Sequence, residues 1–305
     1  MIIAMVAVSV IFENNEIIFP EIFAIVIGAW ISEKQPWKVG KIKMLVLITA
    51  MAFIGILFVR FVPWQTEYKI IAAFFTAALV LFISKCTFLP IISACVLPII
   101  MGTESIIYPI SVFVMMTFIL VVKNILENKN IVKKSTDNEY NFDFKTEAAR
   151  WLMIFLIFSP ICFIAVKCNM IFLIAPPLLV AFSEFTYADS QTRKTPVKIW
   201  LITSVCAVIG AYSRCFLSVM LNIPIVVTTA IIAIAVIVIL VKSKTLFPPS
   251  GALSLLPMII PEDKLIIYPF LVILSSAVLI FFAMLIGKVL NRTKSENVEI
   301  ETVIG

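Results

Sequence analysis

The sequence predicts an all-α, polytopic membrane protein that consists of two parallel structural repeats, each with about six helical elements. Three observations predict this fold class: an apolar composition, a series of apolar segments joined by short charged loops, and an internal duplication. Of the 305 residues, 62% are hydrophobic and 14% are charged, whereas soluble domains contain about 45–50% apolar and about 25% charged residues. Together with a mean hydropathy of +1.12, this composition excludes an ordinary soluble fold.

Twelve apolar segments follow one another along the chain, and each is a candidate helix. They lie at 1–12, 17–32, 44–61, 67–84, 88–102, 106–122, 150–167, 170–186, 199–217, 223–241, 249–260 and 266–287. The first is short and lacks the basic start and the cleavage site of a signal peptide, so we expect it to be retained as a helix. A straight helix needs about 20 apolar residues to cross a bilayer. We therefore expect the second and fifth elements of each half to be short or broken.

A long polar stretch divides these segments into two groups of six. We expect a first transmembrane repeat at 1–123, a cytoplasmic linker at 124–149, a second transmembrane repeat at 150–292 and a cytoplasmic tail at 293–305. No polar stretch is long enough to bury the core of a separate soluble domain.

The two groups resemble each other in sequence. The stretches FLPIISACVLPIIMGTESIIYP (88–109) and FPPSGALSLLPMIIPEDKLIIYP (247–269) each contain two prolines eight residues apart and end in Ile-Ile-Tyr-Pro. Upstream, KMLVLITAMAFIGILFVR (43–60) aligns with KIWLITSVCAVIGAYSR (198–214), and FPEIFAIVIGAW aligns with APPLLVAFSEF. Three matches in the same order predict a duplication. An even number of elements makes the repeats parallel, so a pseudo-two-fold axis along the membrane normal relates them.

The basic residues predict how the protein sits in the membrane. If every element crosses, 19 of the 24 Lys and Arg residues lie on the side that holds the linker and both termini. Because cytoplasmic loops carry the excess of Lys and Arg, we expect a multi-pass protein of the plasma (inner) membrane with cytoplasmic N- and C-termini. Orientation thus explains the net charge of +6, and we expect no nucleic-acid partner.

The fifth element of the second half begins with Pro248-Pro249-Ser250-Gly251. Proline fits the first turn of a helix, glycine permits close approach of another group, and helix N-termini attract anions. In transporters with structural repeats, broken helices mark the substrate site. We therefore expect a site between the halves, near Ser93 and Ser250 and near the starts of the second elements, Pro20 and Pro176. The alternative is a tight turn that only lets helix ends pack.

The stretch KTLFPPSGALSLLP (244–257) resembles the signature region of the HPP family of integral membrane proteins. That family is named for a His-Pro-Pro motif, which a run of small residues follows. The resemblance covers most of 150–292. The first half of the chain has the same outline but only one of the two adjacent prolines, Pro90. Phe247 stands where the family has histidine, whereas the core of the motif is intact as Pro248, Pro249, Ser250, Gly251 and Ala252. The resemblance implies a permease for a small anion such as nitrite.

A few polar residues inside the apolar segments are candidate functional residues, because such residues are costly in a bilayer and often functional. Arg60 and Arg214 occupy matched positions near the outer ends of two helices. Either their side chains extend to the membrane–water interface, or the two form a pair of positive charges, cationic posts, at the entrance for an anion. Glu184 either carries a coupling proton or anchors a helix end. Thr49 and Thr203 are expected to bond back to carbonyls of their own helices.

Catalysis is not predicted. The sequence has no histidine and shows no paired intramembrane carboxylates and no thiol beside a base, so the usual acid–base and nucleophilic arrangements are missing. The six cysteines lie in or beside apolar segments without a Cys-x-x-Cys pair. We therefore expect neither a metal nor a cofactor.

The leading functional hypothesis is a membrane permease for a small solute, most simply a small anion, with the lipid bilayer as its surroundings. An exporter of an organic or aromatic acid is one alternative, and a non-transporting membrane scaffold or sensor subunit is another. Self-association into a homo-oligomer is also left open. A polar cavity between the halves would favour the permease, whereas an interface packed solid with apolar side chains around Ser250 and Gly251 would favour the scaffold.

Overall fold

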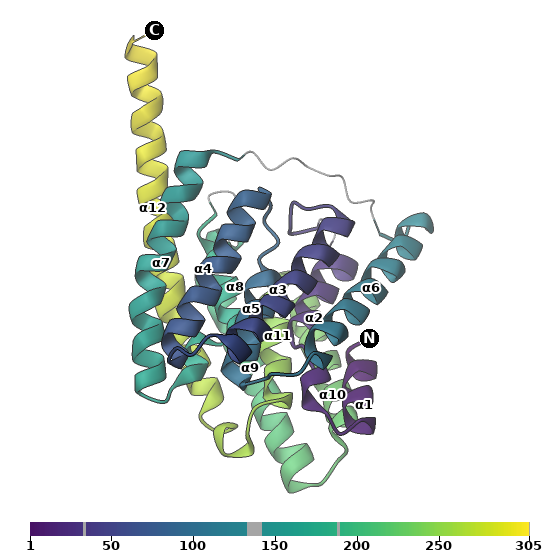
Figure 1. Cartoon of the computed structure of the whole chain (residues 1–305). Coiled ribbons are helices and arrows are strands. Elements are labelled where there is room, and N and C mark those ends of the chain that lie inside the picture. The colour runs from purple at the N-terminus through teal and green to yellow at the C-terminus, as the bar shows by residue number, and fades with distance from the viewer. Residues whose placement is uncertain (33–34, 133–141, 188–189, 305) are drawn as a thin grey trace.

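The computed structural model describes the backbone of residues 1–32, 35–132, 142–187 and 190–304, and these residues form an all-helical bundle (Figure 1). Seven helices of the described chain are long and apolar enough to cross a membrane. The predicted all-α class is therefore confirmed, and the seven long apolar helices are consistent with a protein that crosses a membrane several times.

The first half of the chain contains six α-helices. They are α1 (Ile2–Ile11), α2 (Glu21–Val26), α3 (Lys41–Phe61), α4 (Thr66–Ser84), α5 (Pro90–Met101) and α6 (Ile107–Asn128). A π-helical turn, Ile27–Ile31, continues α2. Each of the six apolar segments predicted in this half thus contains a helix.

The second half also contains six α-helices. They are α7 (Phe144–Lys167), α8 (Pro176–Phe185), α9 (Pro196–Ser213), α10 (Ile225–Lys242), α11 (Pro248–Leu255) and α12 (Tyr268–Ile304). A π-helical turn, Arg214–Met220, continues α9, and a 3₁₀ turn, Leu256–Met258, continues α11. All six predicted segments of this half are helical as well.

Three helices extend beyond their predicted ends into polar sequence. The predicted linker at 124–149 is shorter, because α6 continues to Asn128 and α7 begins at Phe144, and α12 runs on through the predicted tail. The apolar pattern marks where a helix lies in the bilayer, but the backbone bonds of a helix continue equally well outside it. Asp143 starts α7 by accepting the backbone N–H groups of Lys145 and Thr146 at 3.3 Å each, as an N-cap does.

The long helices surround the short ones. In the seven long helices, between 33% and 44% of the residues of the apolar stretches are buried inside the protein, so the remainder faces outward. In contrast, every residue of α2 and α11 is buried, and so are nearly all residues of α5 and α8. We call α2, α5, α8 and α11 the short helices; they form the centre of the bundle.

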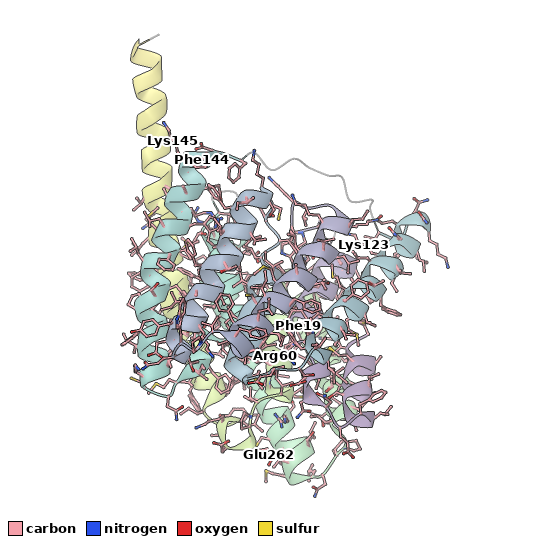
Figure 2. The ribbon with its side chains drawn as sticks, viewed as in Figure 1. Phe19, Arg60, Lys123, Phe144, Lys145 and Glu262 are labelled. Atoms are coloured by element: carbon pink, nitrogen blue, oxygen red, sulfur yellow. The ribbon has the colours of Figure 1, made fainter. Side chains whose placement is uncertain are left out.

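The two ends of the bundle are readily distinguished. The end of α6, the start of α7 and the end of α12 all point toward the side that is uppermost in Figure 1, which we call the upper end. Figure 2 shows Lys145 at the upper end, Glu262 at the opposite, lower end, and Phe19 between them. The chain therefore reaches the start of α2, two residues after Phe19, in the interior of the bundle.

Helices of the two halves have equivalent neighbours. Each short helix packs against a short helix of the other half, α2 against α11 and α5 against α8. Likewise α1 packs against α10 as α7 packs against α4, and α3 packs against α5 and α6 as α9 packs against α11 and α12. The halves are thus interleaved and do not stand as two separate bundles.

Several individual contacts also occur once in each half. The Tyr108 hydroxyl donates to the carbonyl of Ala94 at 3.0 Å, and the Tyr268 hydroxyl donates to the carbonyl of Leu253 at 2.7 Å. Both tyrosines come from the Ile-Ile-Tyr-Pro sequences, and the carbonyls lie four residues after Pro90 and four residues after Pro249, the prolines that the two stretches share. In each half, therefore, a long helix is bonded to the short helix before it in the chain.

Candidate functional site

The candidate site lies among the short helices, where the structure brings polar residues of both halves together. Ser250 and Gly251 lie in the first turn of α11 and are wholly buried. The two prolines before them occupy the first helical positions, as the sequence predicts. The stretch is therefore a buried helix start, which is compatible with a ligand site and equally with a turn that only lets helix ends pack.

Gly251 of α11 is in direct contact with α2. A β-carbon placed on Gly251 would lie 2.5 Å from Cδ1 of Ile27 and 3.2 Å from the ring of Phe23. Ile27 and Phe23 are four residues apart and so share one face of α2. At this point the interface between the halves is packed with apolar side chains, which is the arrangement expected of a scaffold or of a closed permease.

Ser250 contacts a neighbouring helix. Its hydroxyl lies 3.4 Å from the hydroxyl of Thr203 on α9, and both side chains are buried. The prediction that Thr203 bonds back to its own helix is therefore wrong, because the close approach of α11 offers it a partner from another helix. The same prediction is wrong for Thr49, whose buried hydroxyl has no hydrogen-bond partner among the described residues.

Glu21 is the residue that the sequence analysis missed. It is the first residue of α2, its side chain is 0% exposed, and neither carboxylate oxygen has a hydrogen-bond partner among the described residues. Ser93 of α5 lies beside the Glu21 carboxyl, although the two groups are not in strict hydrogen-bond geometry. An acidic residue directly after Pro20, at the start of an apolar segment, was the signal that could have identified it.

Glu184 lies close enough to Glu21 for the two carboxylates to repel each other if both are charged. Glu184 is near the end of α8, and its side chain is partly exposed. Beside it, the hydroxyl of Ser183 is buried without a partner among the described residues. The expectation that the protein has no paired intramembrane carboxylates is thus wrong. The pair is invisible in the sequence because α2 and α8 belong to different halves.

The predicted residues Pro90, Pro176 and Ala252 are all buried at the short helices. Pro90 and Pro176 are the first residues of α5 and α8, and Ala252 follows Gly251 in α11. Phe247, which stands in the place of the HPP-family histidine, is also buried and packs edge-on against Phe185 of α8 with 5.9 Å between ring centroids. An apolar ring contact thus occupies that position here.

Arg60 and Arg214 lie apart from this cluster and are bound to loop carbonyls. Nε of Arg60 donates to the carbonyl of Glu104 at 2.6 Å, and a terminal nitrogen of Arg214 donates to the carbonyl of Ile260 at 2.6 Å and also to that of Pro257. Each arginine therefore fastens a long helix to the segment that follows α5 or α11. This arrangement agrees better with a structural role than with cationic posts that await an anion.

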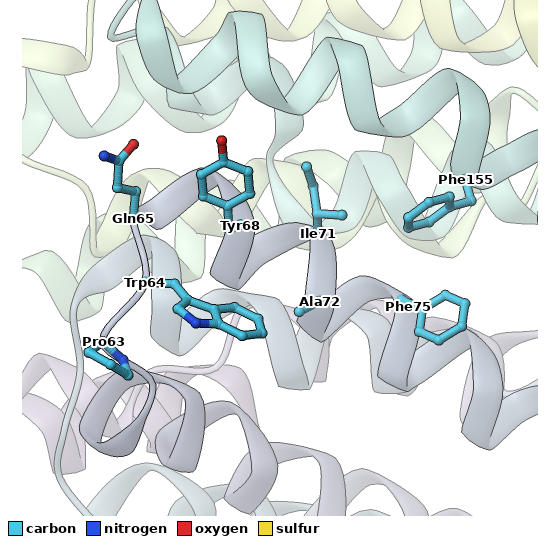
Figure 3. Close-up of a pocket in the computed structure, with 8 residues that line it drawn as sticks. All are labelled: Pro63, Trp64, Gln65, Tyr68, Ile71, Ala72, Phe75 and Phe155. Carbon is cyan, nitrogen blue, oxygen red and sulfur yellow. The ribbon is translucent and has the colours of Figure 1, made fainter.

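Two cavities of the described chain differ in size and position. One, of about 10 Å³, is lined by residues of the second half that include Thr203, Phe247 and Ser276, and it has room for a single water molecule. The other, of about 670 Å³, is an aromatic groove on the outer face between α4 and α7. Figure 3 shows Trp64, Tyr68 and Phe75 along this groove, with Phe155 of α7 opposite. Its apolar lining suits lipid and not a small polar solute.

No family model, curated protein or solved structure matches the chain significantly. Function is therefore inferred from the chain's own residues. The arrangement at the short helices offers hydroxyl groups that can donate or accept hydrogen bonds and two carboxyl groups that can hold a proton or a cation.

Proposed function

We propose that this protein is a permease of the plasma membrane for a small anion such as nitrite, and that the anion crosses between two parallel repeats at the short helices. One observation carries the proposal: the short helices place two polar contacts in the interior of an apolar bundle. Ser93 of α5 lies beside Glu21 of α2, and Ser250 of α11 lies 3.4 Å from Thr203 of the long helix α9. Polar groups at such a depth are costly and commonly functional, and interrupted helices commonly form the binding sites of transporters.

The equivalent contacts of the two halves support the parallel repeats. The Tyr108 and Tyr268 bonds, the interleaved packing of the short helices, and left-handed residues at matched positions all recur. Lys85 and Lys244, for example, have φ values of 47° and 52° at the ends of α4 and α10. A duplicated fold would explain why several independent contacts occur once in each half.

The expected orientation also belongs to this proposal. We expect the upper end, with its excess of Lys and Arg, to face the cytoplasm. A distant relationship to the HPP family is consistent with the buried position of its Pro-Pro-Ser-Gly-Ala core.

A membrane scaffold or sensor subunit is the second candidate. The contact of Gly251 with Ile27 and Phe23 favours it, because an apolar interface between the halves needs no solute. In the permease, the same contact closes the path, and it would separate when the path opens.

Uptake into proteoliposomes tests the proposal. Purified protein is reconstituted, and uptake of nitrite, nitrate, formate and chloride is compared for wild type, Ser93→Ala and Ser250→Ala. We expect one anion to be preferred and its flux to fall several-fold in both variants, because each removes a hydroxyl from the buried cluster. Ser159→Ala is the matched control, since Ser159 of α7 is only half-buried and bonds back to Phe155 of its own helix.

The outcomes separate the candidates. Flux that is selective and sensitive to Ser93 and Ser250, but not to Ser159, supports the permease. Failure of well-folded wild type to move any of the four anions contradicts a small-anion permease and favours the scaffold or an exporter of an organic or aromatic acid. Gly251→Leu is a poor probe of the site, because its larger side chain would collide with α2.

A further inference from the structure

Glu21 is placed where an ionised carboxylate is poorly tolerated. Its side chain is fully buried, and it forms no ion pair among the described residues. An isolated carboxylate in an apolar interior is far more costly than the neutral acid, so such a group survives paired, bound to a cation or protonated. Glu21 therefore needs a positive partner that the described side chains do not supply.

Within the described part of the chain, the groups that face Glu21 do not include a basic side chain. Glu184 of α8 is the charged group close enough to interact with it, and Tyr108 of α6 and, next to Tyr108, Cys95 of α5 are the other titratable groups nearby. The hydroxyl of Tyr108 is already bonded to Ala94. From α11 the residues Pro248–Leu255 bring no titratable side chain. Among the described residues, therefore, no neighbouring group supplies a positive charge to balance an ionised Glu21.

A proton suits this pair better than a metal cation does. Sodium and similar ions are held by several oxygen ligands, commonly including carbonyls that an unwound helix exposes. Here the polar groups near Glu21 are Ser93 and Glu184, and the residues after it continue as a helix whose carbonyls are engaged. When two carboxyl groups share a site, one of them holds a proton far more readily than it would alone.

The two carboxyl groups also differ in their access to solution. Glu21 is sealed in the interior, whereas Glu184 lies near the upper end of α8 and is partly exposed. This difference in exposure sets the order in which a proton reaches the two groups. A proton from the solution at the upper end reaches Glu184 before Glu21. At the lower end, Glu21 would be reached only after the packed short helices separate.

We propose that Glu21 is the proton-coupling residue of the permease, with Glu184 on its route to solution, and that Glu21 binds and releases one proton in each transport cycle. This inference rests on the proposed function. The anion enters next to a neutral carboxylic acid, and the proton returns to solution when the anion leaves. No other bond is made or broken, and the net movement is one anion with one proton. A bare anion beside two ionised carboxylates would be repelled, so the proton also explains how an acidic site accepts an anion.

Anion uptake under imposed gradients tests the coupling. In proteoliposomes we expect a pH gradient, but not a sodium gradient, to drive accumulation of the preferred anion by wild type. Glu21→Gln keeps the shape of the side chain but cannot titrate, so we expect it to lose gradient-driven accumulation while anion exchange without a gradient remains. Glu21→Asp should retain part of the accumulation. Glu104→Gln, which alters an exposed acid at the lower end, is the matched control and should behave as wild type.

Infrared difference spectroscopy gives a second readout that needs no transport. Wild type at neutral pH should show the carbonyl band of a protonated carboxylic acid, and this band should be absent in Glu21→Gln and present in Glu104→Gln. A wild type without this band, or a band unchanged in Glu21→Gln, would overturn the assignment to Glu21.

The outcomes for function and coupling are distinguishable. Anion flux that ignores the pH gradient and survives in Glu21→Gln leaves the permease intact and overturns the coupling site. Accumulation that follows the sodium gradient overturns the choice of the proton. If folded wild type moves no anion at all, the proposed function fails, and the coupling site fails with it.

Discussion

At the scale of single residues, two glycines determine how closely the short helices approach the long ones. A β-carbon on Gly55 of α3 would lie 2.5 Å from the carbonyl oxygen of Cys95 on α5, and one on Gly210 of α9 would lie even closer to that of Ser254 on α11. Because the obstructing atoms belong to the backbone, they cannot turn aside as a flexible side chain would. Both glycines, which the sequence comparison had matched, thus serve close helix packing.

We expect Gly55→Ala and Gly210→Ala each to lower thermal stability. A side chain that is too large for a tight interface lowers the free energy of unfolding by about 1–3 kcal/mol. Here the added methyl group would meet the backbone of the neighbouring short helix, so that backbone must move. The measurement is the temperature at which half of the detergent-purified protein aggregates. Ala50→Leu is the control, since Ala50 on α3 is exposed. Unchanged stability in both glycine variants would show that the helices are further apart than described.

At the scale of the elements, two of the short helices, α5 and α11, are each bonded to a long helix by a tyrosine hydroxyl. Tyr108 and Tyr268 each reach from the first turn of a long helix to the carbonyl of a short one. Both tyrosines are buried, and an aromatic ring, Phe19 or Phe172, packs edge-on against each. The short helices are too short to be stable alone in water, so their order depends on such contacts.

The two tyrosines should therefore have equal effects. Tyr108→Phe and Tyr268→Phe each remove one hydroxyl and leave a buried carbonyl without its partner, which costs about 1–3 kcal/mol. Melting of the two single variants and the double variant in detergent measures this effect, with Tyr212→Phe at an exposed position as the control. Loss of stability in one variant alone would argue against equivalent roles in two repeats.

At the scale of the whole molecule, the bundle has two opposite ends, with Lys145 at the upper end and Glu262 at the lower end (Figure 2). Cys168 caps the lower end of α7 and is exposed, whereas Cys86, Cys95, Cys162 and Cys206 are buried. If the upper end faces the cytoplasm, Cys168 faces the outside of the cell.

A maleimide that cannot cross membranes should consequently label intact cells through Cys168. Labelling is measured by the mass shift of the purified protein, and Cys168→Ser should abolish it. Cys215→Ser serves as a comparison, because Cys215 is partly buried in the π-helical turn that ends α9. Labelling of Cys168 only after the cells are opened would reverse the proposed orientation.

The sequence alone was enough to predict which segments are helices and that the second and fifth elements of each half are short. It also suggested which residues of the two halves correspond. These properties follow from local apolarity, proline placement and short-range order, all of which a linear pattern records. It also located Ser250, Gly251 and Glu184 as candidates. Only the tertiary structure decided that Ser250 meets Thr203, that the arginines are bound to loop carbonyls, and that Glu21 lies beside Glu184. Those contacts depend on how helices from distant parts of the chain pack against each other. The choice of neighbouring helix leaves no periodic pattern in the sequence of either helix.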